Sequence, residues 1–352
     1  MNIYVIIILL LFLFSVLDIK TGIDMTSKKI IFYIAIIFLC VFSALRWNTG
    51  QDFVTYIEIY NFSKPILSGL DIFVGYSNIE PGFKVLASIA KEFDSEALYL
   101  FLCCFMSLVP LCVGIIRLNR VEKIGYFFPL LIYFLVFMIS YNFNAMRQAI
   151  TMGFFIYSLS DMYHRKTSRV FIVSAIAIMF HSTGGLILLS YLAYSRFNVL
   201  NGTRLLFFIA PFTVLLYFFS PLYHLLSILG VNIEAWREQW GRVDVISLFL
   251  RFVIIFLFAF PLKLHKQQGL PNLLLNLYIQ GFVIYIALFD LGMMATRFNM
   301  FFRVIEILLV PIVIYRMKHN LNKGVVFSIF MLIFIMIFFV TAQQEVNLYK
   351  IR

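Results

Sequence analysis

Long apolar runs alternate with short polar connections along the whole chain, and this alternation limits what the chain can fold into. An apolar run of about 20 residues crosses a lipid bilayer as a helix. Only 13% of the residues are charged, whereas soluble domains average about 25%. The 42 phenylalanines and the hydrophobic share of 62% are therefore expected to lie in lipid or between helices. The sequence predicts an all-α polytopic integral membrane protein.

About ten runs are long enough to be transmembrane helices. The first run lacks the basic start and the small-residue cleavage site of a signal peptide, so it is expected to be a retained span. We expect one membrane domain over residues 1–352. The expected spans are Asn2–Leu17, Ile30–Leu45, Ala97–Ile116, Ile124–Ser140, Asn144–Ser160, Leu205–Ser220, Val245–Leu262, Asn272–Leu291, Phe298–Tyr315 and Val325–Val340.

The basic residues orient these spans, because short loops rich in Lys and Arg stay in the cytoplasm. Residues 46–96 and 221–244 then form the first and second extracytoplasmic loops. Within the first, Pro81–Phe93 has apolar residues at helical spacing and predicts an interfacial amphipathic helix. The net charge of +11 is read as this orientation signal, and no nucleic-acid partner is expected. The basic loops are Lys20–Lys29, Arg117–Lys123, Arg165–Arg169, Lys263–Lys266 and Arg316–Lys323.

The segment Arg169–Tyr194 does not fit this alternation. If it crossed the membrane once, the later basic loops would face outward, against the charge rule. His181, Ser182 and two following glycines interrupt its apolar residues. A re-entrant or otherwise broken helical segment restores the charge pattern, and such breaks are tolerated where they line a cavity. A single tilted helix is the alternative.

Arginines inside the expected spans are costly and need a reason. Four of them fall in the extracytoplasmic half of the membrane. One guanidinium group can bind two oxygens of a phosphate at once. The sequence therefore predicts a phosphate- or pyrophosphate-binding site. As alternatives, Arg303 could pair with Glu306, Arg297 could reach the membrane surface, and Asp290 could pair with one of the set. The four are Arg147, Arg251, Arg297 and Arg303.

Carboxylates and one histidine are available on the same side of the membrane. Asp52 and Glu80 lie in the first extracytoplasmic loop, and either could serve as a general base toward a hydroxyl. His181 is the competing candidate, with the alternative that it is a hydrogen-bonded core residue. No cofactor and no metal site are expected. The four cysteines, which lack metal-ligand spacing, are expected to pack in the interior: Cys40, Cys103, Cys104 and Cys112.

Several short motifs, in order, give the chain a family resemblance. Arg46 to Tyr56 reads Arg-Trp-Asn-Thr-Gly-Gln-Asp-Phe-Val-Thr-Tyr, and Glu80-Pro81-Gly82-Phe83 follows it. Met146-Arg147-Gln148-Ala149-Ile150, Phe180-His181-Ser182 and the later Arg297-aromatic segment come next. Together these motifs resemble those of EpsG-like, Wzy-type polysaccharide polymerases.

The resemblance implies an activity and a location. Such polymerases act at the outer face of the bacterial cytoplasmic membrane on repeat units carried by undecaprenyl pyrophosphate. They transfer the growing glycan to a sugar hydroxyl on another lipid-linked unit, and a chain-length regulator is a further expected partner. The product class, whether O-antigen (lipopolysaccharide), capsule or exopolysaccharide, stays open. The positions that match the family's motifs are Arg46, Asp52, Tyr56, Glu80, Arg147, Gln148, His181 and Arg297.

The resemblance and the membrane placement together suggest roles. Arg147, Arg297 and Arg303, with Arg251, would bind the leaving pyrophosphate. Asp52, Glu80 or His181 would be catalytic, and Arg46, Tyr56 and Gln148 would bind substrate. The main alternatives are a flippase or transporter of lipid-linked glycan and an O-antigen ligase-like glycosyltransferase. A membrane acyltransferase is disfavoured because no His-rich cytoplasmic cluster is present.

Overall fold

The computed structural model describes residues 2–19, 24–74, 79–197, 241–262, 269–318 and 320–351, together with residues 228, 234, 237 and 238. The expected span Leu205–Ser220 and most of the expected loop 221–244 lie outside the described residues. The described part is all-helical, and its only β-type pairing is one bridge between Arg46 and Ile351. It divides into two compact units, Met1–Leu189 with Lys318–Arg352 (unit 1) and Ser190–Met317 (unit 2).

The helices follow the apolar runs closely. In unit 1 they are α1 Asn2–Ile19, α2 Met25–Ala44, α3 Phe53–Phe62, η1 Ile66–Phe73, α4 Pro81–Glu92, α5 Glu96–Leu118, α6 Phe127–Tyr133, η2 Phe134–Asn144, α7 Met146–Tyr163, α8 Thr167–Ile178, η3 Ser182–Gly184, α17 Asn320–Ala342 and η5 Glu345–Asn347. α9, Gly185–Phe197, begins in unit 1 and ends in unit 2. In unit 2 they are α13 Val245–Leu262, α14 Leu270–Ala287, α15 Gly292–Arg303 and α16 Glu306–Arg316.

Five helical segments among the described residues are long and apolar enough to cross a membrane: α2, α5, α6 with η2, α14 and α17. α15 and α16 make a sixth if they form one span, but they meet at a bend of 46°. The expected span Phe298–Tyr315 therefore falls on two helices, because α15 starts earlier, at Gly292, and the helix breaks after Arg303; whether the two form one span stays a prediction. The protein is a multi-pass membrane protein, and the number of about ten spans stays a prediction.

The segment Arg169–Tyr194 is broken, and the alternative of one continuous helix is wrong. α8 ends at Ile178, and η3 separates it from α9. The Ser174 hydroxyl donates a hydrogen bond of 2.9 Å to the Gly184 carbonyl, so the chain folds back on itself at His181. A Cβ on Gly184 would lie 2.5 Å from the Ala177 carbonyl carbon, which explains the need for glycine at this reversal.

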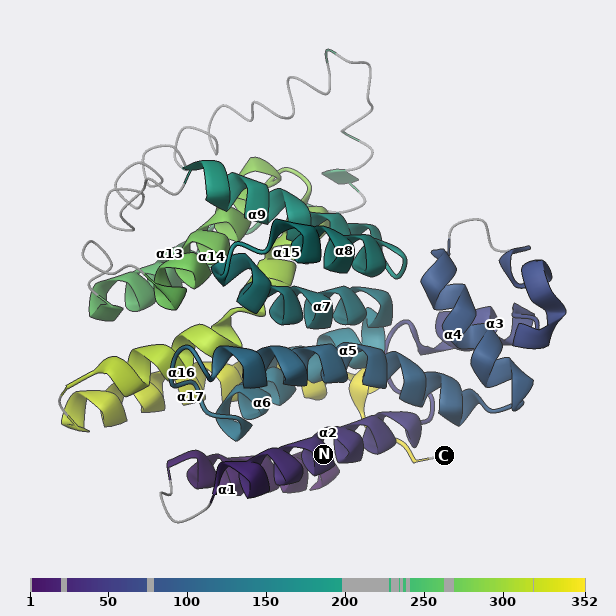
Figure 1. Ribbon diagram of the computed structural model, residues 1–352, viewed down its shortest axis with the longest axis horizontal. Helices are drawn as coiled ribbons and strands as arrows, with labels where there is room; N and C mark the ends of the chain where they lie inside the picture. Colours follow the sequence, from purple (N-terminus) through teal and green to yellow (C-terminus); the bar gives the residue numbers. More distant parts are fainter. Residues whose placement is uncertain are drawn as a thin grey trace. The chain divides into compact units, whose positions relative to one another are not determined.

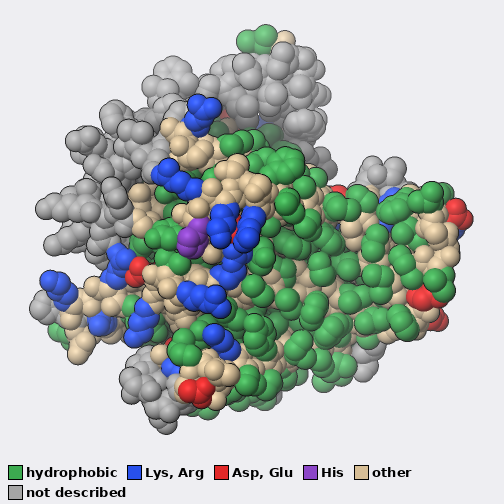
Figure 2. All heavy atoms as spheres, viewed as in Figure 1, with side chains coloured by type: hydrophobic (Ala, Val, Ile, Leu, Met, Phe, Trp, Pro, Cys, Tyr) green, Lys and Arg blue, Asp and Glu red, His purple; other side chains and the backbone are tan. Residues whose placement is uncertain are grey.

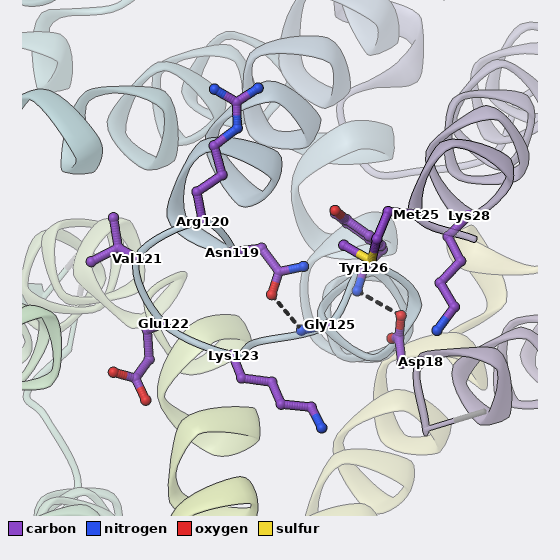
Figure 3. Close-up of a pocket in the computed structure, with 10 residues that line it drawn as sticks. All are labelled: Asp18, Met25, Lys28, Asn119, Arg120, Val121, Glu122, Lys123, Gly125 and Tyr126. Carbon is purple, nitrogen blue, oxygen red and sulfur yellow. Dashed lines mark hydrogen bonds between the residues drawn. The ribbon is translucent and has the colours of Figure 1, made fainter. Parts of the chain in front are cut away.

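Three of the basic loops meet at one end of unit 1. Lys28 at the start of α2 and Asn119 and Lys123 after α5 line a pocket of about 290 Å³ there (Figure 3). Asp18 of α1 lines it too, accepting backbone hydrogen bonds of 2.8 to 3.0 Å from the first residues of α6. At the end of α7, Asp161 pairs with Arg117 at 2.7 Å and with Arg169, at the start of α8, at 3.9 Å. Loops predicted to share one side of the membrane therefore share one end of this unit.

Lipid-facing surface is visible as exposed hydrophobic side chains. Figure 2 shows a broad hydrophobic area beside a separate gathering of Lys and Arg. Exposed positions along α1, α2 and α17 include Leu13, Ile34 and Leu332, each 61 to 62% exposed. Such surface would be costly in water and is ordinary in a bilayer.

α5 and α7 have the most extensive contact of any helix pair in the described part of unit 1, and α2 packs on the other side of α5 (Figure 1). Glycines allow the close approach. A Cβ on Gly114 of α5 would lie 2.6 Å from the Ile156 carbonyl oxygen of α7. One on Gly153 of α7 would collide with the Ser107 carbonyl oxygen of α5. Backbone atoms cannot retreat as flexible side chains do, so both positions require glycine.

Gly153→Val is expected to lower the stability of the protein by about 1–3 kcal/mol, the usual cost of overpacking. Thermal unfolding in detergent, followed by size-exclusion chromatography, measures the effect. Gly324→Val is the matched control, because a Cβ on Gly324 of α17 meets nothing within 4 Å. Equal stability of the two variants would contradict the tight α5–α7 contact.

Candidate functional site

The centre of the candidate site in unit 1 is the first turn of α7. The preceding residues, Phe134–Asn144, form a π-helix, a rare geometry that often accompanies functional sites. The helical path breaks at Ala145, whose ψ is 59°, and α7 begins at Met146. Arg147 therefore lies at a helix N-terminus, where backbone N–H groups and the helix dipole favour an anion.

Glu80 pairs directly with Arg147. Glu80 Oε2 lies 2.6 Å from Arg147 Nη1, and the two side chains are 22% and 27% exposed. Glu80 precedes α4, and Pro81 starts that helix with its fixed φ. The pairing joins two motifs 67 residues apart. It places one expected base and one expected phosphate ligand in contact.

Gly82 fixes the position of Glu80. Its N–H donates a hydrogen bond of 2.7 Å to the Met179 carbonyl, immediately before the Phe180-His181-Ser182 motif. A Cβ on Gly82 would lie 2.8 Å from the same oxygen. The start of α4 is therefore held against the reversal after α8, and only glycine permits this approach.

The apolar residues expected to make Pro81–Phe93 an interfacial helix lie inside unit 1. The helix itself spans Pro81–Glu92, and Phe83, Leu86 and Ala87 belong to a buried cluster with Tyr56 and Tyr99. The amphipathic pattern of α4 is therefore satisfied by packing against protein. A position at the membrane interface stays a prediction.

Tyr56 of α3 links Arg147 to Asp52. The Tyr56 side chain is 5% exposed, and burial raises its pKa to about 12. The charge of Arg147 and a hydrogen bond from it oppose this rise, whereas the charge of Asp52 adds to it. Both charged groups therefore act on one phenol, so the first and third motifs meet here.

Asp52 differs from Glu80 in its surroundings. It is half-buried and immediately precedes α3, and among the described residues its carboxylate makes no hydrogen bond and no ion pair. The turn before it needs Gly50, whose φ is 110° and whose Cβ would lie 2.6 Å from the Phe143 carbonyl oxygen. Asp52 is thus held by its backbone while its side chain stays available.

His181 belongs to a polar chain that reaches α7. Its Nδ1 accepts a hydrogen bond of 3.2 Å from the Thr183 N–H and lies 2.9 Å from the Thr183 hydroxyl. That hydroxyl lies 3.0 Å from the hydroxyl of Thr151. Thr151 follows Arg147 by four residues, one turn along the same helix face. Thr183 belongs to the polar interruption expected around His181, whereas Thr151 was not predicted, although its spacing from Arg147 was a usable signal.

Arg46 lies beneath the start of α7 and is completely buried. It donates hydrogen bonds to the Ser43 carbonyl at 3.0 Å and to the Met146 sulfur at 3.1 Å. Its guanidinium also covers the Phe143 ring at 4.6 Å. Gln148, on the next part of α7, is only 3% exposed. Substrate binding by Arg46 and Gln148 stays a prediction, and the contacts of Arg46 support the start of α7.

Unit 2 holds the other expected arginines, beginning with Arg303. Arg303 donates two hydrogen bonds to Glu306, at 2.6 and 3.1 Å, and Tyr278 donates a third to the same carboxylate at 2.7 Å. The alternative in which Arg303 pairs with Glu306 is confirmed. The pair sits at the break between α15 and α16, where it bridges the end of one helix and the start of the next.

Arg251 of α13 lies over the Tyr285 ring of α14 at 4.2 Å and donates a hydrogen bond to Asn299 of α15. It therefore ties three helices of unit 2 together. Arg297, two residues before Asn299, is exposed. Asp290 pairs with Arg242, which precedes α13, and its carboxylate lies 3.1 Å from Arg242 Nε. The alternative in which Asp290 pairs with one of the four expected arginines is therefore wrong. A site shared between Arg147 and the arginines of unit 2 stays a prediction.

Among the residues that the structure describes, no group of three or more His, Cys, Asp or Glu side chains could hold a metal ion. The four cysteines are all buried and unbridged. The charged chemistry of the described site thus lies in Arg147, Glu80, Asp52 and His181.

Comparison with protein families decides the relationship. The chain matches the EpsG family over residues 29–350, nearly its whole length. The chain belongs to the EpsG family. This is a family of Wzy-like polymerases, so the expected family is confirmed. Searches of curated proteins and of solved structures find no match.

The match to the EpsG family includes every candidate residue, from Arg46 to Arg303. In this EpsG-family chain, the structure brings together the first four motifs within unit 1, where Asp52, Glu80, Arg147 and His181 lie on adjoining elements. The fifth motif, with Arg297, belongs to unit 2. The segment 344–351 also contacts the first motif, and no pattern in the sequence predicted this contact.

Proposed function

We propose that this EpsG-family chain polymerises lipid-linked polysaccharide repeat units at the extracytoplasmic face of the bacterial cytoplasmic membrane. The observation that supports this best is the convergence of Arg147, Glu80, Tyr56 and Asp52. They come from three separate motifs and combine a cation at a helix N-terminus with a carboxylate, that of Asp52, which has no ion-pair partner among the described residues. A cation that stabilises a leaving pyrophosphate and a base that accepts a hydroxyl proton are the groups needed for a hydroxyl to displace a pyrophosphate.

The substrate would be an oligosaccharide repeat on undecaprenyl pyrophosphate. The acceptor hydroxyl oxygen bonds to the anomeric carbon of the donor sugar, and the bond from that carbon to the pyrophosphate oxygen breaks. The pyrophosphate leaves with the electron pair, and the hydroxyl proton passes to a carboxylate. The bond from the anomeric carbon to the pyrophosphate is already activated, because pyrophosphate is a good leaving group, so the reaction needs no nucleotide.

Arg147 is assigned to the leaving pyrophosphate. Guanidinium N–H groups stabilise charge that develops on phosphate oxygens, and the N-terminus of α7 adds to the same field. Its side chain is 27% exposed, whereas Arg303 is 10% exposed and bound twice to Glu306. Arg297, Arg251 and Arg303 are proposed as further phosphate ligands or as supports for them.

Asp52 is assigned as the general base in preference to Glu80. Glu80 is occupied by Arg147 and holds the guanidinium in place, whereas Asp52 has no such partner among the described residues. A base must be free to accept the proton of the acceptor hydroxyl. Tyr56 lies between the two charges, and His181 remains a second candidate through its threonine chain.

A polymerisation assay with purified protein tests the function. The protein in detergent receives a lipid-pyrophosphate-linked repeat unit from its own host and no nucleotide sugar, and the products are separated by size. A ladder of multiples of the repeat is expected. Binding of the lipid without a ladder would favour a flippase or a ligase. A chain-length regulator, the other proposed partner, would change the length distribution when added and leave the reaction itself intact.

A further inference from the structure

The segment 344–351 runs back along the turn Arg46–Asp52 that carries the first motif. The Trp47 N–H donates a hydrogen bond of 2.8 Å to the Lys350 carbonyl, and the Gly50 N–H donates one of 2.7 Å to the Val346 carbonyl. Arg46 and Ile351 form the antiparallel bridge. The two segments lie at opposite ends of the sequence, so only tertiary structure brings them together.

Buried polar side chains strengthen this pairing. Thr49 is completely buried, and its hydroxyl accepts a hydrogen bond of 3.2 Å from the Lys350 N–H. Asn347 is 1% exposed, and its side chain donates to the Thr341 carbonyl at 2.9 Å. The Tyr4 hydroxyl of α1 donates to the Asn347 carbonyl at 2.8 Å. Buried polar groups that lost these partners would be costly.

Tyr349 attaches the segment to the end of α2. Its ring stacks on Phe42 with centroids 4.3 Å apart and planes 9° apart. Its hydroxyl donates a hydrogen bond of 2.7 Å to the Phe42 carbonyl. This ring therefore contributes both stacking and a hydrogen bond at one point, a few residues before the turn begins.

The other side of the turn is fixed as well. Gly50 lies against the Phe143 carbonyl, and the Gln51 N–H donates a hydrogen bond to the Asn144 side chain. The Asn144 side chain also lies 3.4 Å from the Asn347 side chain. The turn is thus held between the end of the π-helix and the segment 344–351. Asp52 follows directly after this clamped part.

We propose that the segment 344–351 is a positioning element that fixes the turn Arg46–Asp52 and so sets the place of Asp52. The role of Asp52 rests on the proposed function, whereas the covering of the turn does not. Asn347 and Tyr349 are the positioning residues, and neither contacts substrate. Their loss slows the chemical step by misplacing Asp52, while Arg147, which is assigned to the lipid pyrophosphate and is held by Glu80, keeps its geometry.

Two measurements on the full chain in detergent test this. The first is the rate at which a maleimide labels Thr49→Cys, because the four native cysteines are buried and contribute little background. The second is the kcat and KM of polymerisation with the lipid-linked repeat unit. Asn347→Ala and Tyr349→Ala are the test variants. Val346→Ala is the matched control, since its side chain is 44% exposed and its backbone hydrogen bond to Gly50 does not need the side chain.

Labelling of Thr49→Cys is expected to be slow in the parent and in the control, and about tenfold faster with either test variant, as the loss of buried hydrogen bonds implies. The kcat should fall by about tenfold or more with little change in KM. Tyr349→Phe keeps the ring and should retain most of the kcat, which separates positioning from misfolding.

Fast labelling in the parent would overturn the inference, because the segment would then not cover Thr49. Faster labelling with an unchanged kcat would overturn the positioning role. A parent protein that makes no ladder would contradict the proposed function alone. The labelling rates would still decide whether the segment covers the turn.

Discussion

Arg147→Ala should reduce the rate of polymer formation by about 100-fold or more, the usual effect of removing a group that stabilises developing negative charge. The guanidinium lies at the N-terminus of α7 and is partly open, so it is available to pyrophosphate oxygens. The ladder assay with equal amounts of folded protein measures the effect. Arg147→Lys keeps the charge but loses the forked geometry of the guanidinium. Its rate of polymer formation should lie between those of the parent protein and of Arg147→Ala.

Arg117 offers a matched control for this variant. It also forms an ion pair with a buried carboxylate, at 2.7 Å from Asp161, and its side chain is 21% exposed. This pair lies at the end of unit 1 where the basic loops meet. Arg117→Ala should lower stability and leave the activity per folded molecule unchanged. A normal ladder from Arg147→Ala would remove Arg147 from the pyrophosphate site.

Asp52→Asn should lower kcat by about 10²- to 10⁴-fold, the range for loss of a general base. The amide keeps the shape of the side chain but cannot accept the hydroxyl proton at a useful rate. KM should change little, because Arg147 and Glu80 remain in place. Single-turnover measurements of the first ladder step would show the loss directly.

Asp71→Asn is the control for this substitution. Asp71 lies in the same expected loop, is 63% exposed and pairs with Lys64 at 3.1 Å. It should leave kcat unchanged. Glu80→Gln should act differently from Asp52→Asn and raise KM, because Glu80 holds Arg147. A large fall in kcat for Glu80→Gln, with Asp52→Asn normal, would transfer the role of base to Glu80.

The helices that follow long apolar runs could be predicted from the sequence. α2, α5, α13 and α17 follow their apolar runs because a span requires about 20 apolar residues and little else. The Arg303–Glu306 pair was foreseeable as well, since residues three apart share a helix face. The break between α15 and α16 was not, because Val304 and Ile305 are apolar residues that carry no glycine, proline or capping signal for a helix end.

The site itself depended on contacts between distant residues. Each motif drew attention to its own residues, but nothing in the spacing shows that Glu80 and Arg147 touch. That contact requires Gly82 to approach Met179 and α7 to start after a π-helix, and both are properties of the folded chain. A residue with an ordinary identity, such as Asn347, gave no signal because its contribution comes only from the partners it meets.

The approach of Gly82 to Met179 also has a mechanical consequence. It joins the start of α4 to the reversal at His181, so these two segments can move only together. If a substrate drew Arg147 away from Glu80 and the start of α4 moved, the hydrogen bond from Gly82 to Met179 would pass that movement to the residues next to His181. Binding of an anion at Arg147 and the position of the segment around His181 would then be coupled through Gly82.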